Sequence, residues 1–548
     1  MSLEPAALQV LISRLTGVAE EMGAVLRRAA FSPNIKERAD CSAALFTPDG
    51  ELLVQAEHIP VHLGSMPASV RAAIDAFGDG LGPGDQVILN DPFAGGTHLN
   101  DITLVAPCIV DGRLIGWAAN RAHHGDLGGA APGSIPAEAT EIYQEGLRIP
   151  PTLLDAGVRA LLFANSRTPA ERIGDLDAQV GANVVGVERL AAMGDAPLAE
   201  VVDYGERRMQ AALASLPDGT WRRRDVMDST GAAPGQQRPA TLAVTVSVVG
   251  ERITFDFTGT DPQSRGNVNA VEAVTVSAVS YALRAAVDPS IPANGGALRP
   301  VRVVAPPGTI LAAQPPAAVG AGNVEVSQRV ADLCLAALAE PCPERVPAAG
   351  QGTMNNVLIG GDGVGKGGEP AGRAAGGWVY YETVAGGQGG RPGASGMSGV
   401  HTGMTNTVKQ VLQSSSGLPG QSGVHTGMTN TQNSPIEALE RTYPLRVLRY
   451  RLRRGSGGAG RAPGGEGIER DLQVLEDCTV SLITERRVSR PPGLWGGGPG
   501  APGENWLLPT GDESCAERLP DKCTIRLRAG DVVRMLTPGG GGWGPPAD

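Results

Sequence analysis

Histidine and aspartate residues between positions 98 and 123 form the set with the clearest chemical meaning. His98 and Asp101 are three residues apart, and His123 follows 22 residues after Asp101. The intervening sequence is typical of two strands joined by a tight turn at Asp111 and Gly112, and such a hairpin returns the chain to its starting point. Two imidazoles and one carboxylate are ligands that Mn, Fe and Zn accept in proteins. The spacing therefore predicts a divalent-metal site at His98, Asp101 and His123.

The remaining histidines carry weaker signals. The chain has seven, namely His58, His62, His98, His123, His124, His401 and His425. Lone histidines are more often surface or hydrogen-bonded core residues than ligands. We therefore interpret His58 and His62, in AEHIPVHLGS, as residues that flank a turn.

The elements that must position the site can be inferred from hydrophobic periodicity. Up to residue 124 we expect a helix over 4–30, strands over 42–46 and 52–55, a helix over 67–77, a strand over 86–89, a loop over 90–98, and strands over 103–110 and 114–119. The Asp-Gly pair between the first two strands predicts a hairpin. This arrangement places both ends of the second hairpin beside the metal site.

The rest of the chain predicts an α+β, multi-domain protein with mixed sheets. We expect helices within 160–215, strands over 241–249 and 252–258, a helix over 267–286, and a glycine-rich strand-and-loop region beyond 345. Three domains follow as a prediction: a metal-site domain at 1–225, a middle α+β domain at 226–345 and a β-rich domain at 346–548.

Composition limits the classes of function. Apolar residues make up 41% and charged residues 19%, an ordinary globular balance. The formal net charge of −11 argues against nucleic acid as the main partner, because phosphate binding needs a basic face. Seven cysteines without a CxxC pattern fit a reducing cytoplasm. We expect no signal peptide and no membrane span. The 77 glycines predict tight turns and close backbone approaches.

Two motifs are set aside. Residues 360–366 satisfy GxxxxGK, but Gly367 stands where a phosphate loop needs Ser or Thr, and no good helix can start there. We interpret this stretch as a glycine-rich turn. The charged segment WRRRD at 221–225 is interpreted as a solvated face.

One internal repeat stands out. The sequence SGVHTGMTNT occurs at 398–407 and again at 422–431. Solenoids need at least three units, so a local duplication explains the pair better.

Long segments resemble the hydantoinase B/oxoprolinase family over nearly the whole chain. The matching segments are NIKERADCSAALF (34–46), QAEHIPVHLGSMPASV (55–70), NDPFAGGTHLNDI (90–102), NRAHHGDLGGAAPGSIP (120–136), YQEGLRIPP (143–151), FDFTGTDPQSRGNVNA (255–270), IPANGGALRPV (291–301), GTMNN (352–356), YYETVAGGQGGRPGASG (380–396), LRRGSGGAGRAPGGEG (452–467), RPPGLWGGGPG (490–500) and TPGGGGWG (537–544).

The resemblance implies a B-type subunit that works with an A-type subunit carrying the site for ATP and Mg, hence a hetero-oligomer. Related acetone carboxylases hold manganese at ligands that match His98, Asp101 and His123, so Mn is the first expectation, with Fe or Zn as alternatives. ATP in the partner would activate a lactam or imide oxygen, or an enolate in the carboxylases. Water activated by the metal would then open the C–N bond of the cyclic amide.

The resemblance also gives other residues roles. His124 and Asp126 are candidates for proton transfer or for orienting the ligands, with pocket shaping as the alternative. Lys36, Glu37, Arg38 and Glu145 are weaker candidates for substrate contact, with ion pairing at a surface or interface as the alternative.

The chain departs from the family pattern at one motif. HTGMTNT replaces the usual HTHMTNT, so Gly403 and Gly427 stand where the family has a histidine. Only the second copy continues into the family's NSPIEALE at 433–440, so we expect residues 422–431 to take the family position.

Three functions remain open at this stage. The first is the B-type component of an ATP-dependent hydantoinase or 5-oxoprolinase. The second is a subunit of an ATP-dependent ketone carboxylase. A third, small zinc-binding subunit encoded alongside would favour this function. The third is a non-catalytic assembly subunit, motivated by Gly403 and Gly427.

Overall fold

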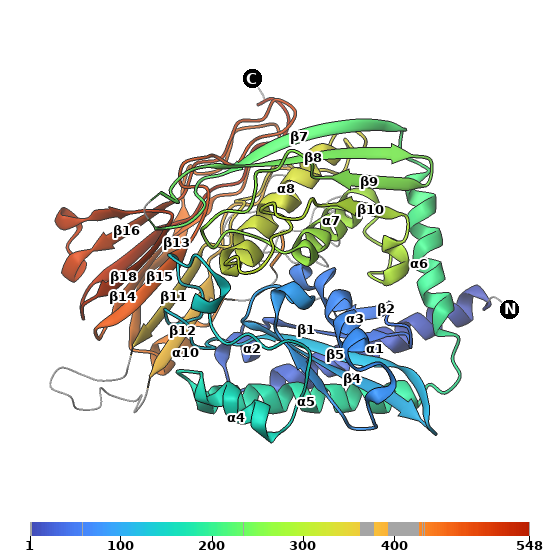
Figure 1. Cartoon of the computed structure of the whole chain (residues 1–548). Helices are drawn as coiled ribbons and strands as arrows, with labels where there is room; N and C mark the ends of the chain where they lie inside the picture. The colour runs from blue at the N-terminus through green and yellow to red at the C-terminus, as the bar shows by residue number, and fades with distance from the viewer. Residues whose placement is uncertain are drawn as a thin grey trace.

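Helices and several separate sheets build the protein, as Figure 1 shows, so the expected α+β class is confirmed. The computed structural model describes residues 3–56, 59–233, 235–361, 377–392, 427–429, 431 and 433–546. Much of the SGVHTGMTNT repeat and most of the GxxxxGK stretch therefore lie outside the described residues. The longest N-terminal helix, α1, spans Pro5–Ala29, close to its expected bounds.

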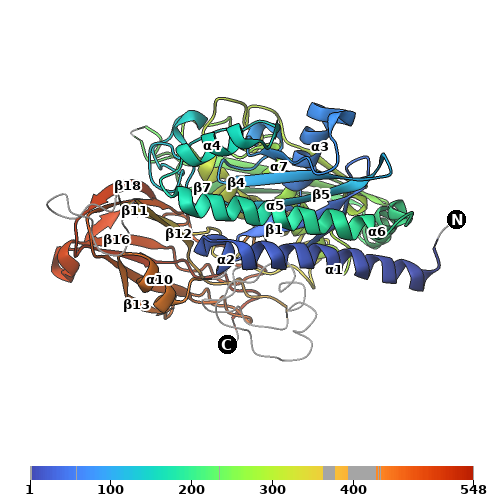
Figure 2. The same cartoon turned by 90° about the horizontal axis from the view of Figure 1, so that it is seen from below.

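The N-terminal region is an antiparallel six-stranded sheet. Its order is β2 (Leu52–Ala56), β1 (Cys41–Phe46), β5 (Arg113–His123), β4 (Asp101–Val110), β3 (Val87–Leu89) and β6 (Thr152–Leu153). Helices α1 and α5 (Pro169–Ala191) lie side by side along one face, as Figure 2 shows, and α3 (Ser65–Phe77) covers the other. Because both faces are covered, β1, β2 and most of β4 and β5 are buried. Both predicted hairpins are present.

The middle region is a four-stranded sheet with two packed helices. The strands run in the order β10 (Val301–Val304), β9 (Arg252–Asp256), β8 (Ala240–Val249) and β7 (Gly219–Met227). Helices α7 (Glu272–Val287) and α8 (Ser327–Leu338) pack together, and α6 (Leu198–Leu213) leads into the sheet. The expected boundary at residue 225 falls inside β7, which pairs with β8 along its full length. The three-domain division stays a prediction.

The C-terminal region consists of two sheets around a common core. One has the order β12 (Trp378–Thr383), β11 (Asn356–Gly361), β15 (Cys478–Ile483) and β18 (Lys522–Leu527). The other has the order β13 (Leu445–Arg453), β14 (Gly467–Val474), β19 (Val532–Leu536), β16 (Glu504–Leu508) and β17 (Glu517–Leu519). Glycine permits close backbone contact here, because a Cβ at Gly464 would lie 1.9 Å from the carbonyl oxygen of Gly540.

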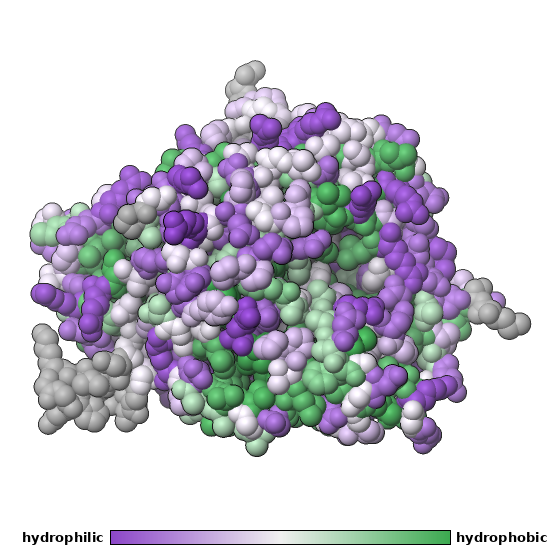
Figure 3. All heavy atoms as spheres, viewed as in Figure 1, coloured by the Kyte–Doolittle hydropathy of each residue, from purple (hydrophilic) through white to green (hydrophobic). Residues whose placement is uncertain are grey.

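The remaining helices are short and lie near the surface. They are α2 (Pro33–Lys36), α4 (Ala156–Ala164) and α10 (Ile436–Thr442). Helix α4 buries only Leu162 and exposes Leu161. Figure 3 accordingly shows hydrophobic surface around the part of the molecule where α4 lies. Within the described ranges, no helix combines the length and hydrophobicity needed to cross a membrane.

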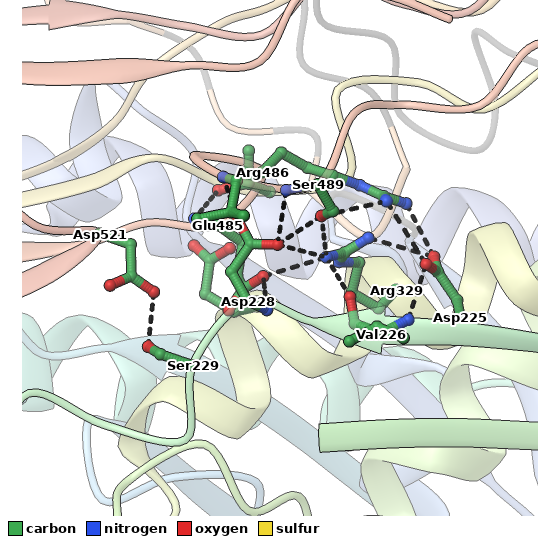
Figure 4. A network of polar contacts seen from close by, with 12 residues as sticks. Asp225, Val226, Asp228, Ser229, Arg329, Glu485, Arg486, Ser489 and Asp521 are labelled. Atoms are coloured by element: carbon green, nitrogen blue, oxygen red, sulfur yellow. Dashed lines mark hydrogen bonds and ion pairs between the residues drawn. The ribbon is translucent and has the colours of Figure 1, made fainter. Parts of the chain in front are cut away.

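A buried ion-pair network joins the middle region to the C-terminal sheets (Figure 4). The guanidinium of Arg329, on α8, lies 3.1 Å from Asp225 Oδ2 and 3.1 Å from Glu485 Oε2. Arg486 reaches the same Asp225 oxygen at 2.7 Å. The interpretation of the WRRRD segment as a solvated face is therefore wrong at Asp225. Its side chain is held by two buried cations, whereas the neighbouring Arg224 is exposed.

Candidate metal centre

Strand pairing brings the predicted metal ligands together. Asp101 is the first residue of β4, His123 is the last residue of β5, and the two are direct partners in the antiparallel register. His98 lies in the turn before β4, where its carbonyl oxygen accepts from the Asp101 amide at 3.1 Å. The hairpin thus gathers the three side chains as the spacing predicted.

Three ligand atoms of these residues converge on one point. His98 Nε2 lies 3.1 Å from Asp101 Oδ1 and 3.2 Å from His123 Nδ1, and His123 Nδ1 lies 3.3 Å from Asp101 Oδ1. Atoms that bind one ion at roughly 2.0–2.2 Å are separated from each other by about 3 Å. The three residues are buried, and among the described residues they form a group able to hold a metal ion. The donor set and its spacing therefore fit a divalent metal.

The electrostatics favour a carboxylate at Asp101 and a neutral imidazole at His123, whereas at His98 the Asp101 charge outweighs the effect of burial and raises the pKa. Burial raises the pKa of Asp101, but the charge of His98 and hydrogen bonds to His123 and His62 outweigh it and hold the pKa well below the usual range. Burial lowers the pKa of His123 to about 3, so its ring stays neutral and keeps a lone pair for a ligand bond.

His62 lies in a short 3₁₀ turn, as interpreted from the sequence, and its side chain also reaches the site. His62 Nε2 lies 3.5 Å from Asp101 Oδ2, and its Nδ1 lies 2.9 Å from Ser42 Oγ. Thr97 and Asn323 also donate to Asp101 Oδ2, the latter at 3.3 Å. The second carboxylate oxygen is thus surrounded by groups that orient it. His58 lies outside the described residues.

A small cavity opens beside the three ligands where the three parts of the chain meet. Apolar side chains on its wall are Ile59, Val61, Val324 and Met354, and polar ones include Thr383, Thr429 and Thr431. Ligand sites are commonly found where separate structural units meet. The wall of this cavity thus combines apolar and polar side chains beside the three ligand atoms.

Asp40 is a cavity residue that the sequence analysis missed. Its carbonyl oxygen accepts from the His123 amide at 3.0 Å, and the residue lines the cavity. Burial, together with the nearby Asp101 charge, raises the pKa of Asp40 to about 7. A carboxyl with that pKa can hold or release a proton near neutral pH. The pairing of Cys41 with Ala122 places Asp40 opposite His123, so the strand register contained the signal.

Tyr381 is a second missed residue and comes from the distant strand β12. Its ring stacks on His123 with a centroid distance of 4.6 Å and an angle of 15°. The guanidinium of Arg38 lies 5.0 Å from the Tyr381 ring and donates to the Tyr381 carbonyl at 2.8 Å. Local sequence contains no signal for a contact between residues 123 and 381.

The predicted substrate contacts separate into buried and exposed groups. Arg38 is buried directly behind the cavity wall, where it also donates to Thr383 Oγ1 at 3.1 Å. Lys36 and Glu37 are exposed and do not line the cavity. Glu145 is buried and accepts from the amides of Val319 at 3.1 Å and Gly320 at 2.8 Å. Burial raises its pKa to about 7. Substrate contact by these residues stays a prediction.

His124 and Asp126 do not line the cavity. His124 Nε2 bonds to Gln179 Oε1 at 2.8 Å on α5, and burial lowers its pKa to about 4. Asp126 accepts from the amide and the guanidinium of Arg167, each at 2.8 Å, and from the Gly133 amide at 3.1 Å. These contacts brace the backbone that follows His123. The proton-transfer role stays a prediction.

A side chain at Gly427, where the family pattern has histidine, would meet the side chain of Gln328. The φ of Gly427 is +71°, and an added Cβ would lie 2.1 Å from Gln328 Oε1. Gly427→Ala should therefore lower the free energy of unfolding by about 1–3 kcal/mol, from the left-handed backbone and the clash. Adding Gln328→Ala should restore the part of the unfolding free energy that the clash removes. Denaturant unfolding of the single and double variants is the measurement. Equal stability of Gly427→Ala and wild type would contradict this account. Gly403 lies outside the described residues.

Glu325 gives a pH dependence with a definite sign. Burial raises its pKa to about 8. Glu325 therefore keeps its proton in the folded protein at pH values where the unfolded chain has already lost it. Between the pKa of the unfolded chain and that of the folded protein, the free energy of unfolding falls as pH rises, by at most about 1.4 kcal/mol per pH unit. Glu325→Gln cannot titrate. The difference in thermal midpoint between this variant and wild type should therefore grow in favour of the variant from about pH 5 to about pH 8. Above about pH 8 the difference should be constant. Parallel pH curves would show that Glu325 is ionised in the fold.

Comparison with known proteins identifies the family. The sequence matches the profile described as hydantoinase B/oxoprolinase over residues 4–410 and 414–546. The chain belongs to the hydantoinase B/oxoprolinase family. An uncharacterized protein of Methanocaldococcus jannaschii is 39% identical, over 99% of this chain and 91% of its own.

Relatives with functional names differ in length. The B-type subunit of a putative D-/L-hydantoinase from a Pseudomonas species is 30% identical, over 100% of this chain and 91% of its own. The 5-oxoprolinase of Saccharomyces cerevisiae is 37% identical over 100% of this chain, which covers only 42% of the yeast protein. The chain thus spans about two-fifths of the length of the 5-oxoprolinases that it matches.

Two solved structures share the fold. An ATP-dependent caprolactamase from Pseudomonas jessenii superposes with a TM-score of 0.85 at 27% identity, covering 100% of this chain and 92% of that one. An acetone carboxylase without nucleotide gives a TM-score of 0.84 at 19% identity, covering 99% of this chain and 76% of that one. The second likeness concerns the fold alone.

Proposed function

We propose that the chain is the B-type subunit of an ATP-dependent cyclic amide hydrolase. It would open a lactam or imide ring at a divalent-metal site, after phosphoryl activation in an A-type partner. The observation that carries the proposal is the convergence of His98 Nε2, Asp101 Oδ1 and His123 Nδ1 beside a small cavity. The names of the hydantoinase subunit and the caprolactamase support the cyclic amide as the substrate class.

His98, Asp101 and His123 would hold the metal, with Mn as the first candidate and Fe or Zn as alternatives. A bound divalent ion supplies Lewis-acid polarisation of a carbonyl oxygen or a water molecule. His62 and Asn323 keep the Asp101 carboxylate oriented through its second oxygen. That support fixes the ligand before substrate enters.

The other cavity residues act on the ring itself. Ile59, Val61 and Val324 would hold the methylene part of the ring and keep bulk water out. Opening a C–N bond leaves a nitrogen that needs a proton. Asp40, with its pKa near neutrality, is the cavity group placed to deliver that proton.

The A-type partner would bind ATP and Mg, and the working enzyme would be a hetero-oligomer. The name of the Pseudomonas hydantoinase relative, which describes it as a subunit, supports a separate partner. The 5-oxoprolinases support it as well, because more than half of their length lies outside the part that matches this chain.

The test is reconstitution. The chain is mixed with an A-type partner, ATP and Mg, and offered hydantoin, 5-oxoproline or caprolactam. We expect ring-opened product, ADP and inorganic phosphate from the complex, and none of the three from the chain alone. ATP hydrolysis by the lone chain would contradict the assignment of ATP to the partner. A metal-loaded complex without turnover would favour the non-catalytic assembly role.

A ketone carboxylase subunit is the second candidate, favoured by the shared fold with acetone carboxylase. The same complex would then consume acetone or acetophenone only when bicarbonate is present, and it would leave all three cyclic amides intact.

A further inference from the structure

A single π-helical turn, Gly322–Val326, lies against the metal centre and leads directly into α8. Such turns are rare and occur frequently at functional sites. Gly322 packs so closely on the segment before α7 that an added Cβ would lie 1.9 Å from the carbonyl oxygen of Asn269. The next two residues, Asn323 and Val324, reach the cavity wall.

The turn contacts one ligand directly. Asn323 Nδ2 donates to Asp101 Oδ2 at 3.3 Å, on the oxygen that faces away from the two histidines. The Asn323 carbonyl accepts from Ser327 Oγ at 2.6 Å, which fixes the backbone of the turn at this residue. The contact restricts rotation of the Asp101 carboxylate.

The turn reaches a second ligand through a buried relay. Glu325 Oε1 accepts from Asn356 Nδ2 at 2.9 Å, and Asn356 Oδ1 accepts from the Tyr381 hydroxyl at 2.9 Å. Tyr381 then stacks on His123. Glu325, Asn356 and Tyr381 are all buried, so water does not compete for these bonds. The relay fixes the ring that covers one face of the His123 imidazole.

The turn is anchored from behind. Arg329 follows Val326 by three residues and is fully buried, and its guanidinium holds the carbonyl of Val226 at 2.6 Å and Ser489 Oγ at 3.0 Å (Figure 4). These contacts tie the start of α8 to β7 and to the C-terminal region, so the turn has a fixed position relative to both.

We propose that the π-turn Gly322–Val326 sets the mutual orientation of Asp101 and His123, with Asn323 and Glu325 as positioning residues. The inference rests on the proposed metal site. The ligand atoms converge before an ion arrives because the turn holds one carboxylate directly and one imidazole through the Tyr381 ring.

The first test needs no metal. The chain has only seven histidines, so ¹³C labelling of their ring carbons gives a simple NMR spectrum in which His123→Gln identifies one signal. In the metal-free wild type, the ring current of Tyr381 should shift the His123 ring proton upfield. Glu325→Leu should abolish that shift, whereas Glu325→Gln, which keeps the acceptor for Asn356, should retain it. Val330→Ala, a buried change elsewhere on α8, serves as the control for general destabilisation and should retain the shift.

The second test measures Mn²⁺ and Zn²⁺ affinity of the same variants. Glu325→Leu and Asn323→Ala should each weaken binding by about 10–100-fold, the effect typical of groups that orient metal ligands. Glu325→Gln should stay near wild type. If Glu325→Leu fails to fold, Tyr381→Phe, which loses only the hydroxyl, should still reduce the upfield shift.

The outcomes separate the two proposals. A wild type that binds neither ion would overturn the metal site, while the NMR comparison would still decide the role of the turn. A metal-binding wild type whose Glu325→Leu and Asn323→Ala variants keep both the His123 shift and the affinity would overturn the positioning role alone.

Discussion

Replacing His98 and His123 together by alanine should abolish stoichiometric metal binding and ring-opening activity while leaving the fold intact. Both imidazoles direct one nitrogen at Asp101 Oδ1, and the removal of both leaves a single carboxylate as ligand. One carboxylate cannot hold a divalent ion in competition with water, because such sites need three or more protein ligands. Elemental analysis of the purified wild type and the double variant is the measurement. Circular dichroism shows whether the double variant is folded.

Lys36→Ala is the matched control for this experiment. Lys36 is exposed and lies outside the cavity lining, so its variant should bind metal as the wild type does. A folded wild type without Mn, Fe or Zn would refute the metal centre. Metal retained by the double variant would also refute this metal centre, because the ion would then be bound elsewhere.

The local part of the metal centre could be predicted from sequence because it depends on one hairpin. Turn residues between two apolar runs define the pairing, and the pairing alone places Asp101 opposite His123. Side chains of successive strand residues point to opposite faces. That alternation explains why His123 faces the cavity whereas His124, the next residue, contacts Gln179 on α5.

The rest of the site depends on contacts between distant segments. Tyr381 and Asn323 meet the hairpin only because the C-terminal sheets and the π-turn pack against it. His62 belongs to a short 3₁₀ turn whose direction is set by packing, so its spacing from His98 carried no information. Asp40 is an intermediate case, since the register of β1 with β5 would have placed it. Periodicity identifies elements, but the packing of elements depends on side chains far apart in sequence.

Asp225 also depends on contacts with distant segments. It lies in the charged run of β7, on the strand face opposite to that of the exposed Arg222 and Arg224, and shares its own face with Arg223. Its role changes because α8 and residues 485–489 bring two arginines to it. A sequence window of ten residues cannot contain that information.

Arg329→Met should strongly destabilise the middle region. Met fills a similar volume without the charge, so the variant leaves Asp228 and Glu485 buried with fewer cations. Breaking a buried ion pair in this way costs about 3–5 kcal/mol. With an unfolding entropy of about 2.1 cal/mol/K per residue over the whole chain, the thermal midpoint should fall by about 3–4 °C. Lys522, 2.7 Å from Glu485 Oε1, limits the loss because it still neutralises one of the two carboxylates.

Arg223→Met is the matched control, on the same edge strand as Asp225. Arg223 forms an ion pair with Glu340 at the surface, and both side chains are partly exposed, so its loss should cost at most about 1 kcal/mol. The thermal midpoint of Arg329→Lys, which keeps a cation, should lie between those of Arg329→Met and Arg223→Met. If Arg329→Met unfolds at the temperature of Arg223→Met, the network contributes no more than a surface pair. In that case the anchor of the π-turn must lie in the apolar contacts of α8 rather than in its charges.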